Sequence, residues 1–318
     1  MHALGMNAAT GHLDCLKYLH DNGCPWNEMA YVYAAKNGHL DCLIYLYENG
    51  CPWSEYVYTY AAKGHLDCLK YLHENGCPWD VVACEKAAQG HLDCLKYFHE
   101  QSLAEDKDEC PWDKRACVSA AEGHLECLIY LHKNGCPWDE EAYTFAAEGH
   151  LDCLTYLHEN GCPRNVNAYV FAAEGHLDCL IYLHENGCPW SERVCAYASG
   201  GHLDCLKYLH ENGCPWSVAA YANASGGHLD CLKYLHENGC PWNEWVCLMA
   251  AKGHLDCLKY LHENGCLWNE WVCVAAAKGG HLDCLKYAHE NGCLWTIAEC
   301  IEAAQNYPEC LAYIKHTK

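Results

Sequence analysis

The feature that most constrains this chain is a short sequence that recurs along its whole length. The segment GHLDCLKYLHENGCPW occupies residues 201–216. The histidine of its Gly-His-Leu marker stands at positions 12, 39, 65, 91, 124, 150, 176, 202, 228, 254 and 281, and an eroded copy, NYPECLAYIKH, ends the chain. Successive markers are 26 or 27 residues apart, except for 33 residues between positions 91 and 124. A fixed period of this kind is typical of a solenoid, in which each unit buries its faces against its neighbours.

Each unit is expected to form two short helices. Asn243 can cap a first helix, EWVCLMAAK, that stops at Gly253. The second helix, HLDCLKYLHEN, is closed by Gly265 at a position that favours left-handed backbone geometry. Helices of about ten residues are too short to be stable alone, so stacking between units must hold them.

The period therefore predicts an all-α, helix-turn-helix solenoid of about twelve units that spans residues 1–318 as a single domain. The one long interval contains an acidic insertion, QSLAEDKDE, at residues 101–109. The last unit, at about residues 296–318, is more polar than the others and is expected to act as a C-terminal cap.

The two histidines and two cysteines of each unit raise the question of a metal site. On a helical wheel at about 100° per residue, Cys205, Leu206 and Leu209 form one apolar stripe that suits a buried face. His210 lies about 140° from Cys205 on this wheel, so the two side chains cannot converge on one ion.

Binding of a metal between units is no easier, because neighbouring helices pack about 8–10 Å apart, whereas zinc holds its ligands at about 2.0–2.3 Å. We interpret the cysteines as small buried hydrophobic residues and expect no bound metal and no cofactor. In the alternative interpretation, His202 and Cys205 chelate a metal and Cys214 or a neighbouring loop completes the site.

The residue before each predicted cap is tryptophan in every unit except one, and the fourth residue of the following helix is cysteine or tyrosine. Trp190 with Cys195 and Trp242 with Cys247 are examples. This pattern predicts a hydrophobic staple, an apolar contact across the start of the helix. The exception, Arg164, is interpreted as sequence drift.

Charge and composition narrow the classes of partner and the compartment. The formal net charge is −22, from 42 acidic and 20 basic residues, which argues against nucleic-acid binding and favours a partner protein with a basic surface.

No apolar run of about 18 residues exists, so we expect no membrane span. The first residues, MHALGMNAATGHLDC, do not resemble a signal peptide. The 29 cysteines stand at regular helical positions, and we interpret them as reduced thiols in the cytoplasm or nucleus.

The recurring segments resemble those of a known family of repeat proteins. GHLDCLKYLHENG resembles the second helix of an ankyrin repeat, and AAKGH or AAKNGH resembles the end of its first helix and the turn. Units of 26 residues are too short for the β-hairpin of that family, and CPWNEWVC stands where its Thr-Pro-Leu-His signature would be. The chain is similar to the Cys-Pro-Trp ankyrin-like arrays of large DNA viruses and single-celled eukaryotes. The resemblance implies an ankyrin-like solenoid with β-hairpins shortened or absent, which binds proteins.

Comparison of the units with one another indicates where a partner would bind. The seventh residue of every first helix is alanine, as close packing requires, whereas the second and sixth residues vary. These two positions share one helix face, so stacked units would present a continuous variable stripe. The stripe is rich in residue types that dominate interface energetics. The predicted partner-binding residues are Met29, Tyr33, Tyr56, Tyr60, Arg115, Glu141, Phe145, Phe171, Arg193, Tyr197, Trp245, Met249 and Trp271.

The insertion is a second candidate surface. Its acidic residues Glu105, Asp106, Asp108 and Glu109 could contact a basic partner. The alternative is a surface insertion without function, since long loops cost little free energy.

We therefore predict a monomeric, non-enzymatic scaffold that binds another protein. The alternative is a metal or thiol buffer built from the histidine and cysteine columns, that is, the equivalent histidines and cysteines of successive stacked units. An enzyme is not expected, because no glycine-rich phosphate loop occurs and the cysteines and histidines repeat in every unit. A response to pH is a further hypothesis, because the residues of the His210 type lie in the last turn of a helix, where the dipole favours positive charge.

Overall fold

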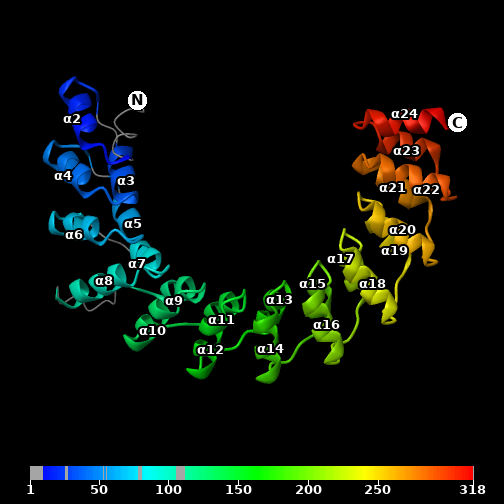
Figure 1. The fold of residues 1–318 in the computed structure, drawn as a ribbon, viewed down its shortest axis with the longest axis horizontal. Helices are drawn as coiled ribbons and strands as arrows, with labels where there is room; N and C mark the ends of the chain where they lie inside the picture. Colours follow the sequence, from blue (N-terminus) through cyan, green and yellow to red (C-terminus); the bar gives the residue numbers. More distant parts are fainter. Residues whose placement is uncertain are drawn as a thin grey trace. The chain divides into compact units, whose positions relative to one another are not determined.

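A computed structural model of the chain describes residues 10–25, 28–52, 54, 56–77, 81–104 and 112–317. Within these ranges the chain forms 23 helices and no strand, which confirms the all-α prediction (Figure 1). Nor is any helix of these ranges both long enough and apolar enough to cross a membrane.

The helices alternate between a first and a second helix in each repeat. The first helices are α3 (Met29–Lys36), α5 (Val57–Ala61), α7 (Val81–Ala87), α9 (Lys114–Ala121), α11 (Glu140–Ala146), α13 (Ala168–Ala173), α15 (Glu192–Ala198), α17 (Val218–Ala224), α19 (Glu244–Ala250), α21 (Glu270–Gly279) and α23 (Ile297–Ala303). The second helices are α2 (Leu13–Asp21), α4 (Leu40–Glu48), α6 (Leu66–Glu74), α8 (Leu92–Ala104), α10 (Leu125–Lys133), α12 (Leu151–Glu159), α14 (Leu177–Glu185), α16 (Leu203–Glu211), α18 (Leu229–Glu237), α20 (Leu255–Glu263), α22 (Leu282–Glu290) and α24 (Pro308–His316).

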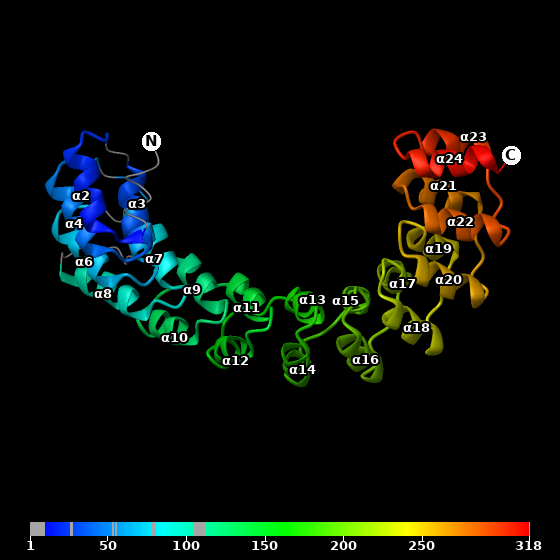
Figure 2. The ribbon, with the colours of Figure 1, turned by 45° about the horizontal axis from the view of Figure 1, so that its top comes forward.

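The chain divides into two compact units. The first comprises the residues up to Ala146 together with His150–Asn165, and the second comprises Ala147–Gly149 and Val166–Lys318. Inside each unit the first helices contact one another in sequence, as α3 does with α5 and α15 with α17. The second helices form their own row, so each unit has two layers (Figures 1 and 2).

The sequence explains where the helices begin and end. The side chain of Asn243 accepts a hydrogen bond of 3.1 Å from the backbone N–H of Trp245, which confirms the predicted cap. The second helix begins at Leu255, one residue after the predicted start, because His254 has non-helical dihedral angles. At the other end, Asn264 donates its amide N–H to the Tyr260 carbonyl at 2.8 Å, and Gly265 has a φ of +84°. The Asn-Gly pair therefore closes the second helix with one polar cap and one left-handed residue.

The core follows the predicted stripe. Cys205, Leu206 and Leu209 are the buried residues of α16, and the same three positions are buried in most second helices. The predicted packing alanines of the first helices from α3 to α21 are fully buried. Small side chains at this position allow consecutive first helices to approach closely.

The Gly-His marker joins consecutive repeats. Gly201 has a φ of +118°, and a Cβ atom placed on it would lie 2.8 Å from Nδ1 of His228 in the next repeat. Glycine is therefore required at this position for two reasons. The backbone conformation disfavours other residues, and the imidazole leaves no room for a Cβ atom. In the last repeat Tyr307 takes the place of the histidine and lies against Gly280.

The acidic insertion is described only in part. Helix α8 continues through residues 101–104 and has 13 residues, against nine in α6 and α10. The acidic residues Glu105, Asp106, Asp108 and Glu109, which were predicted to contact a partner, lie outside the described residues.

Candidate protein-interaction surface

The cysteines that follow each Asn-Gly pair connect one repeat to the preceding one. The thiol of Cys162 lies 3.2 Å from the carbonyl oxygen of Asp139, the residue at the start of the preceding first helix. Cys293 makes the same contact with the Asn269 carbonyl at 3.2 Å. A thiol is a small hydrophobe that carries a weak donor, and here it satisfies a carbonyl at the start of a helix. The residue type is thus explained by packing.

Burial makes the thiols of Cys162 and Cys153 poor metal ligands, whereas a hydrogen bond with the Cys273 thiol lowers the pKa of Cys293. Burial raises the pKa of Cys162 to about 12 and that of Cys153 to about 11, whereas a metal site needs the thiolate. In the described ranges, no three His, Cys, Asp or Glu side chains lie close enough together to hold a metal ion. Nothing in this geometry supports the metal or thiol-buffer alternative.

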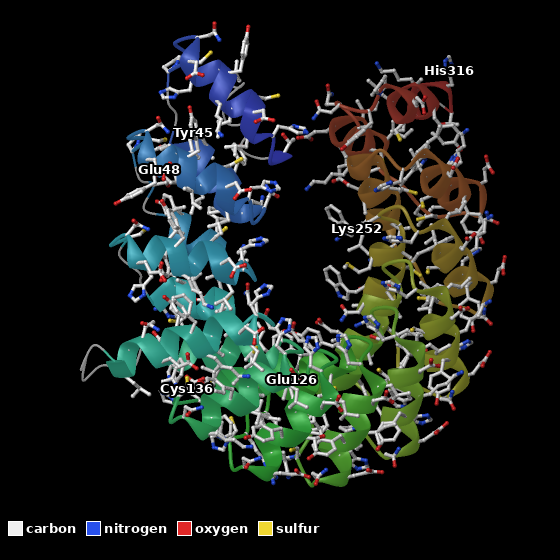
Figure 3. The ribbon with its side chains drawn as sticks, turned by 60° about the vertical axis from the view of Figure 1, so that its left-hand side comes forward. Tyr45, Glu48, Glu126, Cys136, Lys252 and His316 are labelled. Carbon is white, nitrogen blue, oxygen red and sulfur yellow. The ribbon has the colours of Figure 1, made fainter. Side chains whose placement is uncertain are left out.

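The histidines in the last turn of the second helices make a contact that sequence reasoning missed. Nδ1 of His236 lies 2.9 Å from the hydroxyl of Tyr260, one repeat further on. In the first unit, His20 makes the equivalent bond to Tyr45, which is labelled in Figure 3. The same contact occurs within both units, at 2.8–3.2 Å, in the pairs His73–Tyr97, His99–Tyr130, His132–Tyr156, His184–Tyr208, His210–Tyr234, His262–Tyr287 and His289–Tyr313.

Each of these histidines also contacts the tryptophan of the following loop, where one is described; it lies six residues further on, except for His99, whose partner Trp112 follows the insertion. The rings of His132 and Trp138 stack with their centroids 3.8 Å apart, and those of His262 and Trp268 at 3.9 Å. These aromatic contacts run back to the preceding repeat, which the predicted staple did not anticipate. Where Arg164 replaces tryptophan, its guanidinium lies 3.2 Å from Nε2 of His158, so the arginine takes the tryptophan's place beside the imidazole.

These contacts change the expected effect of pH. The helix dipole was expected to favour the charged imidazole, but burial lowers the pKa of His132 and of His99. For His158, burial acts first and the positive charge of Arg164 lowers the pKa further. For these three residues, burial is the largest cause of the lowered pKa, and the neutral imidazole is the form that the fold favours.

The predicted variable stripe lies at the surface in both units. Met29, Tyr33, Tyr56, Arg115, Glu141, Arg193, Tyr197, Trp245 and Trp271 are exposed, and Tyr60, Phe145, Phe171 and Met249 are half-buried. None of the thirteen is buried. The partner and the binding face remain predictions.

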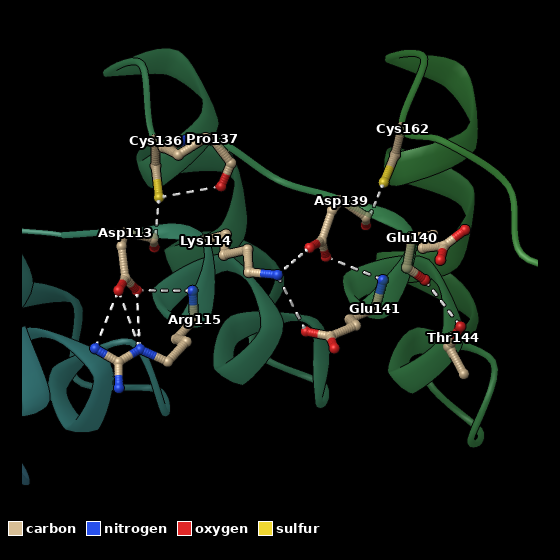
Figure 4. Close-up of polar contacts among 10 residues, drawn as sticks. All are labelled: Asp113, Lys114, Arg115, Cys136, Pro137, Asp139, Glu140, Glu141, Thr144 and Cys162. Carbon is tan, nitrogen blue, oxygen red and sulfur yellow. Dashed lines mark hydrogen bonds and ion pairs between the residues drawn. The ribbon is translucent and has the colours of Figure 1, made fainter.

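In the first unit, the charged stripe residues Arg115 and Glu141 each pair with a residue outside the stripe. The guanidinium of Arg115 contacts the carboxylate of Asp113, two residues before it, at 3.0 Å (Figure 4). Lys114 lies 2.6 Å from a carboxylate oxygen of Asp139 and 3.7 Å from Glu141. These charges are therefore already compensated within the unit.

In the second unit, the stripe is hollowed on both sides of α15. One hollow of about 650 Å³ lies between α13 and α15 and is lined by Phe171, Arg193 and Tyr197 among others. A second, of about 710 Å³, lies between α15 and α17 and shares Arg193 and Tyr197. Sequence reasoning missed the exposed residues Val166 and Val218 at these hollows, although their apolar side chains in loop and first-turn positions were a usable signal.

Further along the same unit, two tryptophans project from consecutive first helices. Trp245 on α19 is 63% exposed and Trp271 on α21 is 50% exposed. Met249 shares the face of Trp245, and its sulfur lies 3.4 Å from the ammonium group of Lys252, labelled in Figure 3. The stripe of the second unit thus combines hollows with exposed aromatic side chains.

These features define a class, a helical repeat protein with packed inter-repeat columns and one variable surface stripe. A family model for ankyrin repeats, described as three copies, matches residues 4–83 and 193–270. The chain belongs to the ankyrin repeat family, which confirms the resemblance. No curated protein sequence matches it.

Solved structures of two repeat classes are similar to this chain. The human ASB11 ankyrin repeat domain is 21% identical, with a TM-score of 0.43, and the match covers 56% of this chain and 96% of that one. The pentatricopeptide repeat protein PPR10 in complex with an 18-nt psaJ RNA element is 13% identical, with a TM-score of 0.45. That match covers 98% of this chain and 57% of the PPR10 chain, so this chain spans little more than half of PPR10.

Proposed function

We propose that the protein is a non-enzymatic scaffold that binds a partner protein along the variable stripe of its first helices. The observation that carries this proposal is the pair of exposed tryptophans, Trp245 and Trp271, on consecutive first helices of one compact unit. Large aromatic side chains bury much apolar area at a low cost in conformational entropy, and tryptophan leads among interface hot spots. Membership of the ankyrin repeat family supports the same class of function.

The composition of the stripe supports recognition over tolerated drift. Exposed positions without a role usually become lysine, glutamate or serine, because such residues solvate well. Here the variable positions carry Tyr56, Tyr197, Trp245 and Trp271 in exposed positions instead. Exposed aromatic residues repeated on one face are typical of a binding surface.

The chemistry of the partner follows from charge. A formal net charge of −22 favours a partner with a basic surface and speeds its association by electrostatic steering. The reduced, buried thiols suit the cytoplasm or nucleus, where we place the protein, and we propose that it acts as a monomer.

Substitution of both tryptophans tests the proposal. Because the side chains are exposed, Trp245→Ala with Trp271→Ala should leave the helicity measured by circular dichroism unchanged. The affinity for a partner that is captured from cell extract and then purified should fall at least tenfold, as expected for hot-spot residues. Tyr18→Ala is the matched control, since Tyr18 is 67% exposed but lies on a second helix, α2. A partner that binds the double variant as tightly as the original protein would exclude this face.

The thiol-buffer alternative has its own test. Protein purified in reducing buffer without chelator should contain no stoichiometric metal by mass spectrometry. Several zinc ions per chain would replace the packing interpretation of the cysteines with a metal-stabilised solenoid.

A further inference from the structure

The two hollows on α15 form one groove across three first helices of the second unit. Arg193 and Tyr197 line both hollows, so the hollows adjoin at these side chains. The outer ends of the groove carry apolar side chains, Val166 before α13, Phe171 on α13 and Val218 at the start of α17, next to the amides of Asn167 and Asn223. Trp190 and Trp216 form fixed walls, because each stacks on the histidine of the preceding second helix.

Arg193 is the one charged side chain that lines either hollow among the described residues. No described carboxylate lies within ion-pair distance of it, and no described carboxylate lines the groove. This is unusual in a chain in which acidic residues outnumber basic residues by 42 to 20.

Comparison with Arg115 shows why Arg193 has no ion-pair partner among the described side chains. Both arginines are the second residue of a first helix. The guanidinium of Arg115 binds Asp113, two residues before it, whereas the equivalent residue before Arg193 is Ser191. The same scaffold position thus carries an arginine paired with a carboxylate in the first unit and, among the described side chains, an arginine without one in the second.

We propose that this groove binds an extended segment of the partner that carries one carboxylate between apolar side chains. The carboxylate accepts paired hydrogen bonds from the guanidinium of Arg193, a geometry that arginine and carboxylate groups share. The flanking apolar side chains occupy the two hollows. A single carboxylate fits better than an acidic run, because the rest of the chain is strongly acidic.

The spacing of the helices sets the length of the bound segment. Neighbouring helices pack about 8–10 Å apart, so three first helices span about 20 Å. An extended chain rises about 3.3 Å per residue, so about six residues cross the groove. This inference rests on the proposed scaffold function and adds the chemistry of the bound segment.

A peptide library tests this directly. Random peptides of about seven residues, displayed on phage, are selected against the immobilised full-length protein, and the best one is synthesised. The selected peptides should share one Glu or Asp with apolar residues on both sides. Arg193→Gln should weaken binding of the synthetic peptide at least tenfold, and Glu→Gln in the peptide should weaken it similarly. The two changes together should cost little more than either one alone, because they remove the same contact.

The chain supplies matched controls. Ser191→Asp should also weaken binding, because it installs next to Arg193 the carboxylate that Arg115 already has. Arg115→Gln should leave peptide binding unchanged. Both Arg193 and Ser191 are exposed, so these variants should keep the original helicity. Failure to enrich any peptide, enrichment of peptides without a carboxylate, or equal binding to Arg193→Gln overturns the inference.

The two proposals fail separately. If a purified partner depends on Trp245 and Trp271 but no peptide depends on Arg193, the scaffold function stands and the carboxylate-binding groove does not. If peptide binding depends on Arg193 but the affinity for the partner is unchanged by loss of both tryptophans, the carboxylate-binding groove is supported and the aromatic face is excluded.

Discussion

Nδ1 of His236 lies 2.9 Å from the hydroxyl oxygen of Tyr260, although the two residues belong to successive repeats. His236 also stacks on Trp242 with the ring centroids 4.4 Å apart. Three residues of the recurring motif, His, Trp and Tyr, therefore meet across each repeat boundary where they are described. The motif therefore encodes packing between repeats, and its histidines serve as hydrogen-bond partners across the boundary.

Removal of one such hydroxyl should lower stability modestly. Tyr260→Phe deletes the hydrogen bond to His236 but keeps the ring, so we expect a loss of about 1 kcal/mol in the free energy of unfolding. Guanidinium denaturation followed by circular dichroism measures this change. Tyr18→Phe is the matched control, because Tyr18 occupies the same motif position in α2 and its hydroxyl bonds to no described residue. Equal stability of the two variants would show that the bond contributes nothing.

Stability should depend on pH below neutrality. The folded chain holds a proton on His132 less tightly than the unfolded chain does, because burial lowers the pKa of this residue. The unfolded pKa is about 6.5, so the stabilisation is fully present above that pH and is lost as the pH falls below it. The melting temperature should therefore decrease between about pH 6.5 and 5. His132→Gln should reduce this slope, and a melting temperature that stays flat across the window would contradict the prediction.

Most thiols should be inaccessible in the folded protein. Of the described cysteines, Cys15 is exposed, Cys24 and Cys188 are half-buried, and the others are buried. Ellman's reagent should therefore label only a small fraction rapidly in native buffer and all 29 cysteines in guanidinium chloride. Rapid labelling of most thiols without denaturant would mean that the cysteine columns are open to solvent.

Two glycines of the repeat differ in what a new side chain would meet. Gly227 has a φ of +114° and faces His254 of the next repeat, whose Nδ1 would lie 2.8 Å from a new Cβ atom. Gly239 has a φ of +75°, but a Cβ atom there would meet open space. Gly239→Ala should cost about 1 kcal/mol through the left-handed backbone, whereas Gly227→Ala should cost clearly more, because its φ lies further from the left-handed well and the imidazole must also move. Equal denaturation midpoints for the two variants would show that packing between the glycine and histidine of the Gly-His marker does not contribute to stability.

Much of this architecture follows from local rules that act within a few residues. The period predicts stacked units, the apolar stripe of Cys205 and its neighbours predicts the buried face, and Asn243 predicts a helix start. Each of these depends on helical periodicity or on a side chain bonding its own backbone nearby. The alternation of constant and variable positions likewise predicts which side chains lie at the surface.

Contacts between repeats could not be predicted in the same way. The partners His236 and Tyr260 are 24 residues apart in the chain, and the thiol of Cys162 meets a carbonyl 23 residues earlier. Such pairs depend on the distance and rotation between packed helices, which the helical period alone leaves open. The arginines at the second position of α9 and α15 are a different case, because Ser191 stands where Asp113 pairs with Arg115, a local difference that the sequence already shows. By itself the sequence determined the repeat, its helices and its surface stripe, whereas tertiary packing decided which side chains of successive repeats meet, because those contacts depend on how the helices are spaced and rotated.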